Sequence, residues 1–385
     1  MIPYGKQDID DNDIEAVIDV LRSEYITQGP QIPLFEETIT NYCGSKYGVA
    51  VNSATSALHI ACLSLGLKKG DWLWASPNSF VASANCGLYC GAEVDFVDID
   101  PLTYNLSINQ LEKKLFQAKK ENKLPKILIS VHFAGQSCMM REINDLSKQY
   151  GFHVIEDASH AIGGKYLGDP IGSCKYSDIT IFSFHPVKII TTGEGGIATT
   201  NSKKLLEKMQ IYRSHGVTRN EKLMNKASEG DWFYQQVHLG FNYRMTELQA
   251  ALGISQMKRV DEFIAKRHVL KKRYDLLLVD LPVITPFNDK NCFSSSHLYV
   301  IQLEIKKIRK SRKQIFKRMR NFGIGVNVHY IPIHTQPYYQ KKGFKEGDFP
   351  VSEAYYNNVI SLPLYHSMTL TQQDEVIAAL KCVLS

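Results

Sequence analysis

Lys188 has the surroundings of a lysine that reacts with a carbonyl compound. It ends the segment 183–188 (SFHPVK), which follows an apolar run, and the glycine-rich segment 191–196 (TTGEGG) comes soon after. A lysine in the loop after a strand can form an imine with an aldehyde cofactor if burial and cationic neighbours lower its pKa to roughly 7–8. The glycines leave room for such a cofactor. Taken alone, the pattern also fits a surface lysine before a glycine-rich turn.

Asp157 lies 31 residues before Lys188 and ends another apolar run, in the segment 156–160 (EDASH). A carboxylate at a strand end suits a pyridine-type cofactor, because it keeps the ring nitrogen protonated and the ring an electron sink. Its neighbour Glu156 is expected to point to the opposite face of the strand and to be structural. The alternative for Asp157 is a cap for the following helix.

The segment 53–58 (SATSAL) passes from a strand into a helix, with small and hydroxyl residues in its first turn. We expect the backbone N–H groups and hydroxyls of Thr55 and Ser56 to hold a phosphate dianion there. Ser183 adds a further hydroxyl. Phe80, after the next strand, is expected to stack on a ring, although a lone aromatic residue can equally belong to the core. These parts together predict pyridoxal 5′-phosphate (PLP) as cofactor.

Seven short apolar runs between residues 49 and 200 alternate with helical patterns. They are 49–51, 72–74, 94–97, 127–133, 153–155, 179–184 and 196–199. This alternation predicts an α/β fold, with a mostly parallel seven-stranded sheet covered by helices on both faces. Ligands of such sheets bind beyond the carboxyl ends of the strands, where Lys188 and Asp157 are expected.

The flanking segments predict helices and a second domain. An opening helix starts at Asp10 or Asp11. Its apolar stripe is Ile14, Val17, Ile18 and Leu21. After Gly240 the pattern changes to a long helix over 246–274, strands at 298–303 and 325–329, and a last helix that begins at Thr371 with a capping box to Asp374. That last helix buries Val376, Ile377, Leu380 and Leu384. We expect a large PLP-binding domain, 1–245, and a smaller C-terminal α+β domain, 246–385.

The composition is that of a globular protein, with 44% hydrophobic and 22% charged residues in 385. No signal peptide or membrane span is readable, so we expect a cytoplasmic protein without membrane contact. None of the eight cysteines has CxxC spacing, which favours reduced thiols over disulfides or zinc. His329 and His334 lack a third ligand, so no metal site is expected.

The segment 306–320 holds nine basic residues and no acid; removing these nine charges from the net charge of +6 leaves the rest of the chain at −3. A polyanion-binding surface is one interpretation. We favour the other interpretation, a helix capped by Ser311 whose basic face is solvated. Its buried apolar stripe would be Ile315, Met319 and Phe322. No nucleic-acid motif supports the first interpretation, and no nucleic-acid partner is expected.

Several of these segments carry a resemblance to the sugar aminotransferases of the DegT/StrS family, which have the type I PLP-dependent, aspartate aminotransferase-like fold. The matching segments are 26–30 (ITQGP) with Phe35 and Glu36, 53–58, 156–160, 183–188 and 239–245 (LGFNYRM). The resemblance covers nearly the whole chain. The segments 131–136 (VHFAGQ), 213–219 (RSHGVTR) and 328–334 (VHYIPIH) are similar to one branch, whose members form UDP-4-amino-4,6-dideoxy-N-acetyl-β-L-altrosamine for pseudaminic acid.

The resemblance implies a role for each matching position. Lys188 is the lysine that carries PLP, Asp157 faces the pyridine nitrogen, and His160 lies by the phenolic oxygen of the cofactor. Asn242 matches a residue that reaches the phosphate from the neighbouring subunit, which implies a homodimer with shared sites. The implied cofactor contacts are Ala54, Thr55, Ser56, Phe80, Asp157, His160, Ser183, Lys188 and Asn242. The implied substrate contacts are Tyr4, Tyr25, Ile26, Thr27, Ala54, Ser183, Asn242, His329 and Tyr330.

The implied reaction transfers the amino group of L-glutamate to C4 of a UDP-linked 4-keto-6-deoxy-N-acetylhexosamine. Two alternatives within the fold are an aminotransferase for another nucleotide-linked 4-keto-sugar and a PLP-dependent sugar dehydratase, which carries histidine where this chain has Lys188. A third alternative is a non-catalytic PLP-binding regulator, but this chain shows no DNA-binding motif.

The chain departs from the family pattern at Ala54 and Ser56, where no functional group is lost, and at Ser296, where the branch has tryptophan. The residue that binds the carboxylates of glutamate is left open among Arg213, Arg219 and Arg244.

Overall fold

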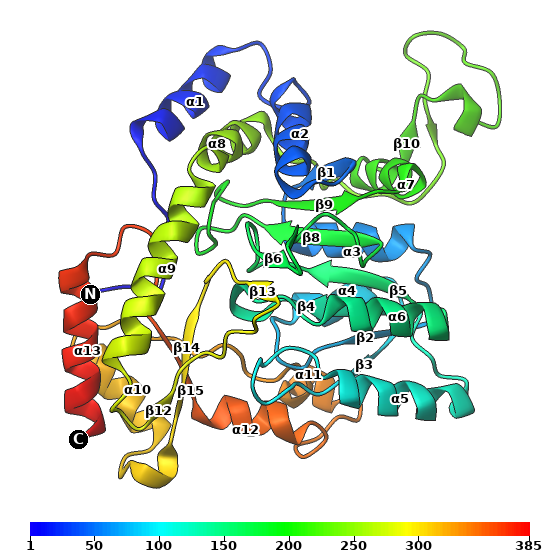
Figure 1. The fold of residues 1–385 in the computed structure, drawn as a ribbon. Coiled ribbons are helices and arrows are strands. Elements are labelled where there is room, and N and C mark those ends of the chain that lie inside the picture. Colours follow the sequence, from blue (N-terminus) through cyan, green and yellow to red (C-terminus); the bar gives the residue numbers. More distant parts are fainter.

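The computed structural model describes all 385 residues, and a seven-stranded sheet forms its centre (Figure 1). The strands are β1 (Tyr47–Val51), β2 (Trp72–Ala75), β3 (Glu93–Phe96), β4 (Ile127–Val131), β5 (His153–Asp157), β8 (Ile179–Ser183) and β9 (Gly196–Thr200), in the order β1-β9-β8-β5-β4-β2-β3. The pairs from β8 to β3 are parallel, whereas β9 runs antiparallel to both of its neighbours. The predicted α/β fold is thereby confirmed.

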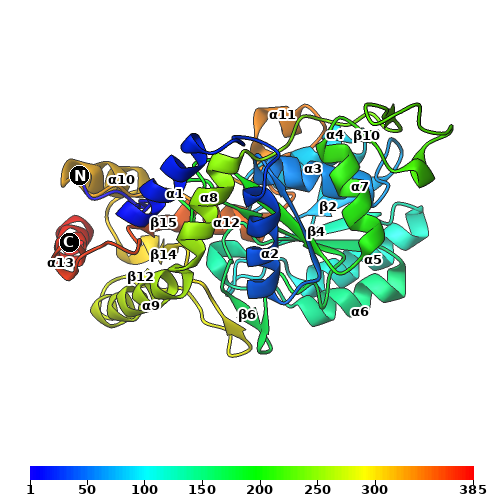
Figure 2. The same ribbon diagram turned by 90° about the horizontal axis from the view of Figure 1, so that it is seen from above.

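Helices cover both faces of this sheet (Figure 2). The alternation of side chains along each strand explains the two layers, because Ile155 of β5 faces one core and Val154 the other. The helices on the Ile155 side are α3 (Ala54–Ser64), α4 (Ala82–Tyr89) and α7 (Lys203–Arg213). The helices on the other side are α2 (Gln31–Cys43), α5 (Ile108–Glu121), α6 (Met140–Tyr150) and α8 (Glu247–Met257).

The opening helix α1 (Asp11–Arg22) begins where the sequence predicts, with Asp10 as N-cap. Its predicted apolar stripe is wrong, because Ile14 is 48% and Leu21 60% exposed. The side turned inward instead carries Asp13, whose Oδ2 lies 2.6 Å from Nη2 of Arg259 and accepts a hydrogen bond from Gln256. A partly buried ion pair with Arg259, which lies between α8 and the next helix, therefore orients α1, and an apolar face is left exposed.

The C-terminal part differs from the prediction in three details. The long helix is broken near Lys258 into α8 and α9 (Val260–Leu277). β14 (Tyr299–Leu303) pairs with β12 (Val283–Ile284) and β15 (Val359–Leu362), but the predicted strand at 325–329 forms only one isolated bridge, between Asn327 and Ser361. In the last helix, α13 (Leu370–Leu384), the capping box joins Thr369 and Gln372, two residues earlier than predicted. Its predicted buried residues are confirmed: Val376, Ile377, Leu380 and Leu384.

The basic segment forms helix α10 (Arg312–Asn321), capped by Ser311 as predicted. Ile315 and Met319 are buried, but Phe322 is 54% exposed because it follows the end of the helix. Of the nine basic residues, only Lys307 forms a salt bridge. The remaining helices are α11 (Pro337–Gln340) and α12 (Pro350–Asn358), and short strands lie at β6 (Lys165–Tyr166), β7 (Asp169–Pro170), β10 (Val217–Thr218), β11 (Gln235–Gln236) and β13 (Cys292–Phe293).

The apolar cores link distant parts of the chain. One joins α2 to the residues from Met245 to Ile264, so α8 and the first half of α9 pack with the large sheet. Another is built from residues between Leu270 and Leu384, and Ile2 is part of it. The division into domains at residue 245 stays a prediction. All eight cysteines are free, and none of the helices combines the length and apolar character needed to cross a bilayer.

Candidate active site

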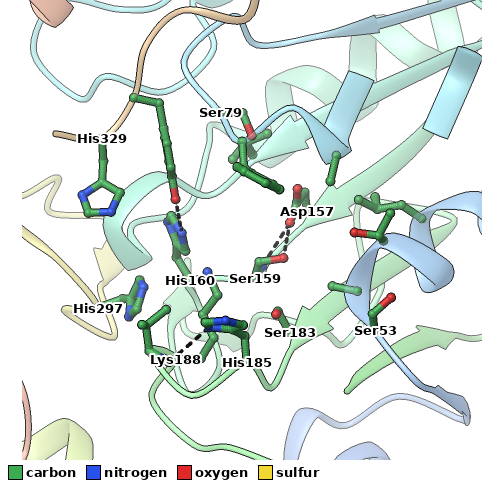
Figure 3. Close-up of a pocket in the computed structure, with 18 of the residues that line it drawn as sticks. Ser53, Ser79, Asp157, Ser159, His160, Ser183, His185, Lys188, His297 and His329 are labelled. Carbon is green, nitrogen blue, oxygen red and sulfur yellow. Dashed lines mark hydrogen bonds between the residues drawn. The ribbon is translucent and has the colours of Figure 1, made fainter. Parts of the chain in front are cut away.

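A cavity of about 580 Å³ lies at the carboxyl ends of β5 and β8, between the start of α3 and the segment 327–330 (Figure 3). It brings together ten of the residues that the sequence singles out. They are Tyr4, Ala54, Thr55, Phe80, Asp157, His160, Ser183, Lys188, His329 and Tyr330. The parallel strands explain this convergence, because their carboxyl ends meet at one edge of the sheet.

Asp157 is the last residue of β5 and is buried at the cavity wall. Its Oδ2 accepts a hydrogen bond of 2.6 Å from Oγ of Ser83, and its Oδ1 accepts one of 2.6 Å from Oγ of Ser159. The backbone N–H of Ser159 also donates to Oδ1, at 3.2 Å. Each carboxylate oxygen thus has a fixed partner, which sets the orientation of the group toward the cavity.

Lys188 lies in the loop after β8, where its backbone N–H donates to the carbonyl of His185 at 2.8 Å. Burial lowers the pKa of Lys188 to about 8, against the smaller opposing effect of the Asp157 carboxylate. A substantial share of this amine is therefore neutral near physiological pH. A neutral amine is the form that attacks a carbonyl carbon.

The start of α3 borders the cavity with its first turn. Ser53 is the N-cap, and its Oγ accepts from the backbone N–H of Ser56 at 3.1 Å. The hydroxyl of Ser56 donates to Oδ1 of Asn52 at 2.7 Å, so Ser56 is buried behind the cavity and does not line it. The N–H groups of Ala54 and Thr55 have no partner within the helix, and the helix dipole adds positive potential there.

A glycine allows β9 to approach this turn. A Cβ atom on Gly196 would lie 2.5 Å from the nitrogen of Ala54 and 2.7 Å from its Cα. No side chain fits in that space, so any other residue would push β9 away from α3. Gly196 thus holds the strand next to the segment that carries the free N–H groups.

Three histidines surround the amine of Lys188 and are neutral. Burial, followed by the charge of Lys188, lowers the pKa of His329 to about 3 and that of His160 well below its ordinary value. Burial also lowers the pKa of His297, and the rings of His160 and His297 lie 4.5 Å apart. His297 comes from the C-terminal part of the chain and meets the cavity beside Lys188 (Figure 3).

Two cavity residues, His297 and Ser53, are not predicted by the sequence pattern. His297 belongs to the His-Leu-Tyr segment 297–299, which drew attention only through the preceding Ser296. Ser53 is the residue that caps α3, and the first-turn pattern pointed to its neighbours instead. Both line the cavity.

Four predicted residues besides Ser56 do not reach the cavity of their own chain: Tyr25, Ile26, Thr27 and Asn242. All four are exposed. Thr27 forms a bridge with Thr246, and Asn242 forms one with Ser214, so the backbone fixes both positions away from Lys188. A site within a single chain therefore lacks them.

No arginine lines the cavity. Nη1 of Arg213 lies 2.6 Å from Oε1 of Glu36 and donates to the carbonyl of Ala50 at 3.0 Å. That arginine is therefore already engaged within the large sheet.

The residues present fit PLP. A buried, oriented carboxylate suits a pyridinium nitrogen, a lysine with a lowered pKa suits the aldehyde, and a helix N-terminus with free N–H groups suits a phosphate. These three features lie around one cavity that is large enough for a cofactor and part of a substrate.

Comparisons with known proteins agree with this chemistry. The DegT/DnrJ/EryC1/StrS aminotransferase family matches residues 7–381. The spore coat polysaccharide biosynthesis protein SpsC of Bacillus subtilis is 37% identical over 99% of this chain and 96% of its own. The UDP-4-amino-4,6-dideoxy-N-acetyl-beta-L-altrosamine transaminase of Campylobacter jejuni is 37% identical over 96% of this chain and 94% of its own.

Solved structures are similar over nearly the full length. The Helicobacter pylori aminotransferase PseC, involved in the biosynthesis of pseudoaminic acid, superposes with a TM-score of 0.90 at 31% identity, covering 100% of this chain and 99% of its own. The PLP form of the Streptococcus pneumoniae putative sugar aminotransferase Spr1654 has a TM-score of 0.88 at 29% identity, covering 99% and 98%. The chain belongs to the DegT/DnrJ/EryC1/StrS aminotransferase family, whose enzymes use pyridoxal 5′-phosphate.

Proposed function

We propose that this enzyme transfers the amino group of L-glutamate to C4 of a UDP-linked 4-keto-6-deoxy-N-acetylhexosamine, as in the pathway to pseudaminic acid. The observation that carries the proposal is the cavity in which Lys188 and Asp157 face His329 and Tyr330 of the C-terminal part. The names of the C. jejuni and H. pylori relatives support the choice of sugar.

The cofactor-binding roles belong to the same proposal. Asp157 holds the proton of the pyridine nitrogen, and the first-turn N–H groups of Ala54 and Thr55, with the hydroxyl of Ser183, hold the phosphate. Phe80 is 62% exposed at the cavity and is available to cover the ring. When bound, PLP supplies the electron sink and carries the amino group between the two substrates.

Lys188 is proposed to move the proton at the carbon that gains or loses the amino group. A pKa of about 8 lets its amine both accept and release a proton near neutral pH, as a general acid–base group requires. Neutral His160, His297 and His329, which line the same cavity, add no repelling charge.

The nucleotide sugar is proposed to bind between Tyr4 and the segment 327–330. Nδ1 of His329 lies 2.7 Å from Oγ of Ser361, whereas Nε2 has only a long contact of 3.5 Å with Nδ2 of Asn327. Nε2 is therefore the ring atom proposed to contact a ligand hydroxyl or phosphate. The ring of Tyr4 packs 5.5 Å from that of His329, which places both at one end of the cavity. The opposite end is formed by α3 and Asp157.

A homodimer with shared sites accounts for the residues that stay outside their own cavity. Asn242 and the segment 25–27 are proposed to complete the cavity of a second copy. The segment 219–240 projects from the body of the chain (Figure 1) and exposes Trp232 to 71% and Leu239 to 80%. Ile14 and Leu21 of α1 are exposed as well. A second copy would cover such apolar surface.

A panel of nucleotide-linked 4-keto-sugars, each assayed with L-glutamate, tests the function. UDP-2-acetamido-2,6-dideoxy-β-L-arabino-hex-4-ulose should be aminated at C4 with a kcat/KM at least about tenfold above that of its xylo epimer, a gap of ~1.4 kcal/mol in transition-state binding. Lys188→Ala protein is the inactive control. Equal rates, or a preference for the xylo sugar, would remove the pseudaminic-acid assignment. A deoxygenated product without an amine would indicate the dehydratase.

A further inference from the structure

Two hydrogen bonds hold the ring of His160. The backbone N–H of Ala134 donates to Nδ1 at 3.3 Å, and Nε2 lies 3.0 Å from the hydroxyl oxygen of Tyr330. Both His160 and Tyr330 line the cavity, and their rings are nearly parallel, with an interplanar angle of 18°.

The first bond fixes the tautomer of His160. An amide N–H can only donate, so Nδ1 must carry a lone pair. A proton on Nδ1 would place two N–H groups against each other at 3.3 Å. The ring is also neutral, since burial and the charge of Lys188 lower the pKa of His160 well below its ordinary value. The single ring proton is therefore on Nε2.

Hydrogen bonds on both sides hold the turn that carries Ala134. Ala134 has a φ of 56°, and its carbonyl accepts from the backbone N–H of His297 at 3.0 Å. Oγ of Ser295 donates to the carbonyl of His160 at 2.8 Å, which fixes the histidine from its other side. Behind the turn, Nε2 of buried His132 lies 2.7 Å from Oε2 of Glu156. The donor to Nδ1 thus has one position.

With its proton on Nε2, His160 donates to the oxygen of Tyr330, and the hydroxyl hydrogen of Tyr330 has no acceptor in the chain. Burial and the charge of Asp157 raise the pKa of Tyr330, so the phenol keeps this hydrogen at neutral pH. We propose that Ala134, His160 and Tyr330 form a one-way chain of hydrogen bonds that directs the hydroxyl of Tyr330 as a donor to an oxygen atom of the ligand in the cavity.

In this series of hydrogen bonds, His160 is a positioning residue that acts through Tyr330. It is neither a general base nor a charged group. The identity of the ligand oxygen rests on the proposed function, because it belongs to the sugar or to the cofactor. The direction of the chain does not rest on it, since all three groups are already in place in the protein alone.

The direction can be measured without cofactor or substrate. In unloaded protein labelled with ¹⁵N-histidine, the His160 signals, assigned by their loss in His160→Gln protein, should show a protonated Nε2 and an unprotonated Nδ1 between about pH 6 and pH 9. Tyr330→Phe protein should keep the same tautomer, because Ala134 sets it. A proton on Nδ1, or a doubly protonated ring at neutral pH, would overturn the proposal.

Kinetics tests the consequence for the ligand. Tyr330→Phe and His160→Leu should each lower kcat/KM by about tenfold or more, and the double variant should lose little more than either, because both break one chain. His160→Gln should recover much of the rate lost in His160→Leu, since a carboxamide can accept from Ala134 and donate to Tyr330. Losses that multiply in the double variant, or equal activities of the Gln and Leu variants, would contradict the chain.

These kinetics separate the chain from the choice of sugar. The glutamate half-reaction, followed by cofactor absorbance, gives a rate even if the proposed sugar is wrong. Cofactor affinity, measured by the same absorbance, shows whether a variant has lost its cofactor instead. If the arabino sugar is not aminated while Nε2 of His160 carries its proton, the proposed function is refuted and the chain of hydrogen bonds is not.

Discussion

Oε2 of Glu247 lies 2.6 Å from the backbone nitrogen of Gln31, and its Oε1 lies 3.2 Å from that of Ile32. Glu247 is the first residue of α8 and is fully buried. The helix that it caps, α2, has Pro30 at its N-cap position and no side-chain cap of its own. One carboxylate thus joins the starts of two helices that are far apart in sequence, and it holds the loop that carries Tyr25 to Thr27.

Replacing Glu247 by alanine should lower the free energy of unfolding by about 1–3 kcal/mol, because two N–H groups at the start of α2 lose their acceptor. Urea titration followed by circular dichroism measures this change. The matched control is Glu37→Ala, because Glu37 is an exposed glutamate of α2 without an ion pair. This substitution should change the free energy of unfolding by less than about 0.5 kcal/mol. Equal effects of the two substitutions would show that the cap contributes nothing.

Covalent capture of the cofactor should follow the titration of Lys188. Because burial lowers the pKa of Lys188 to about 8, the neutral amine increases tenfold per pH unit below that value and levels off above it. The initial rate at which unloaded protein takes up PLP, trapped with borohydride at Lys188, should have this shape between about pH 6 and pH 10.

Asp157→Asn should move that profile to lower pH, because the carboxylate of Asp157 raises the pKa of Lys188. A capture rate that still climbs steadily at pH 10 in the unaltered protein would place the amine near its ordinary pKa. Burial would then not lower the pKa of Lys188 as described above.

Asp157→Asn should also lower kcat by about 10²–10³-fold while the protein still binds PLP, because the ring nitrogen loses its anionic partner. Ser83→Ala provides the graded comparison. It removes one donor to Oδ2 but leaves the charge, so a loss of about tenfold or less is expected. Single-turnover kinetics with L-glutamate measures both. A near-normal kcat in Asp157→Asn protein would refute the assignment.

Inactive Lys188→Ala and Asn242→Asp proteins should restore some activity when mixed. If Asn242 acts in the cavity of its partner, a hybrid dimer holds one intact site, and at most about a quarter of the normal activity per subunit returns at random exchange. Subunit exchange is verified with differently tagged copies. Exchange without rescue would place Asn242 outside the partner's site.

His329→Ala should raise KM for the sugar and leave the glutamate half-reaction nearly unchanged, because His329 packs with Tyr4 at the end of the cavity away from α3. Stopped-flow absorbance separates the two half-reactions. Tyr338→Ala, an exposed residue outside the cavity, serves as control. An equal loss in both halves would assign His329 to the cofactor.

The large sheet and its reactive pair could be predicted because both depend on local patterns. Short continuous apolar runs locate the strands, and residues at strand ends, such as Asp157 and Lys188, fall at one edge of the sheet. The inward face of α1 could not be predicted, because it depends on the ion pair between Asp13 and Arg259, which lie 246 residues apart. A local sequence pattern contains no information about a contact between residues so far apart in the chain.

The missed parts of the site have the same cause. His297 reaches the cavity only because the turn at Ala134 binds its backbone, a contact between the sheet and the C-terminal part. At the start of α3, the hydroxyl residues Ser53, Thr55 and Ser56 are equivalent in the sequence. Only the geometry of the helix cap distinguishes the buried Ser56 from Thr55, which lines the cavity.

The position of Ile2 has a consequence for biosynthesis. Its backbone is bonded to Gly323 and Gly325, and its side chain packs in a core otherwise built from residues between Leu270 and Leu384. A ribosome makes residue 2 long before those partners, so the segment around Ile2 must stay unpaired while the residues between them are synthesised. Tyr4, whose carbonyl accepts a hydrogen bond from the backbone N–H of Leu364, takes its place at the cavity only then. A nascent chain therefore cannot hold a finished active site before Leu364 has been synthesised.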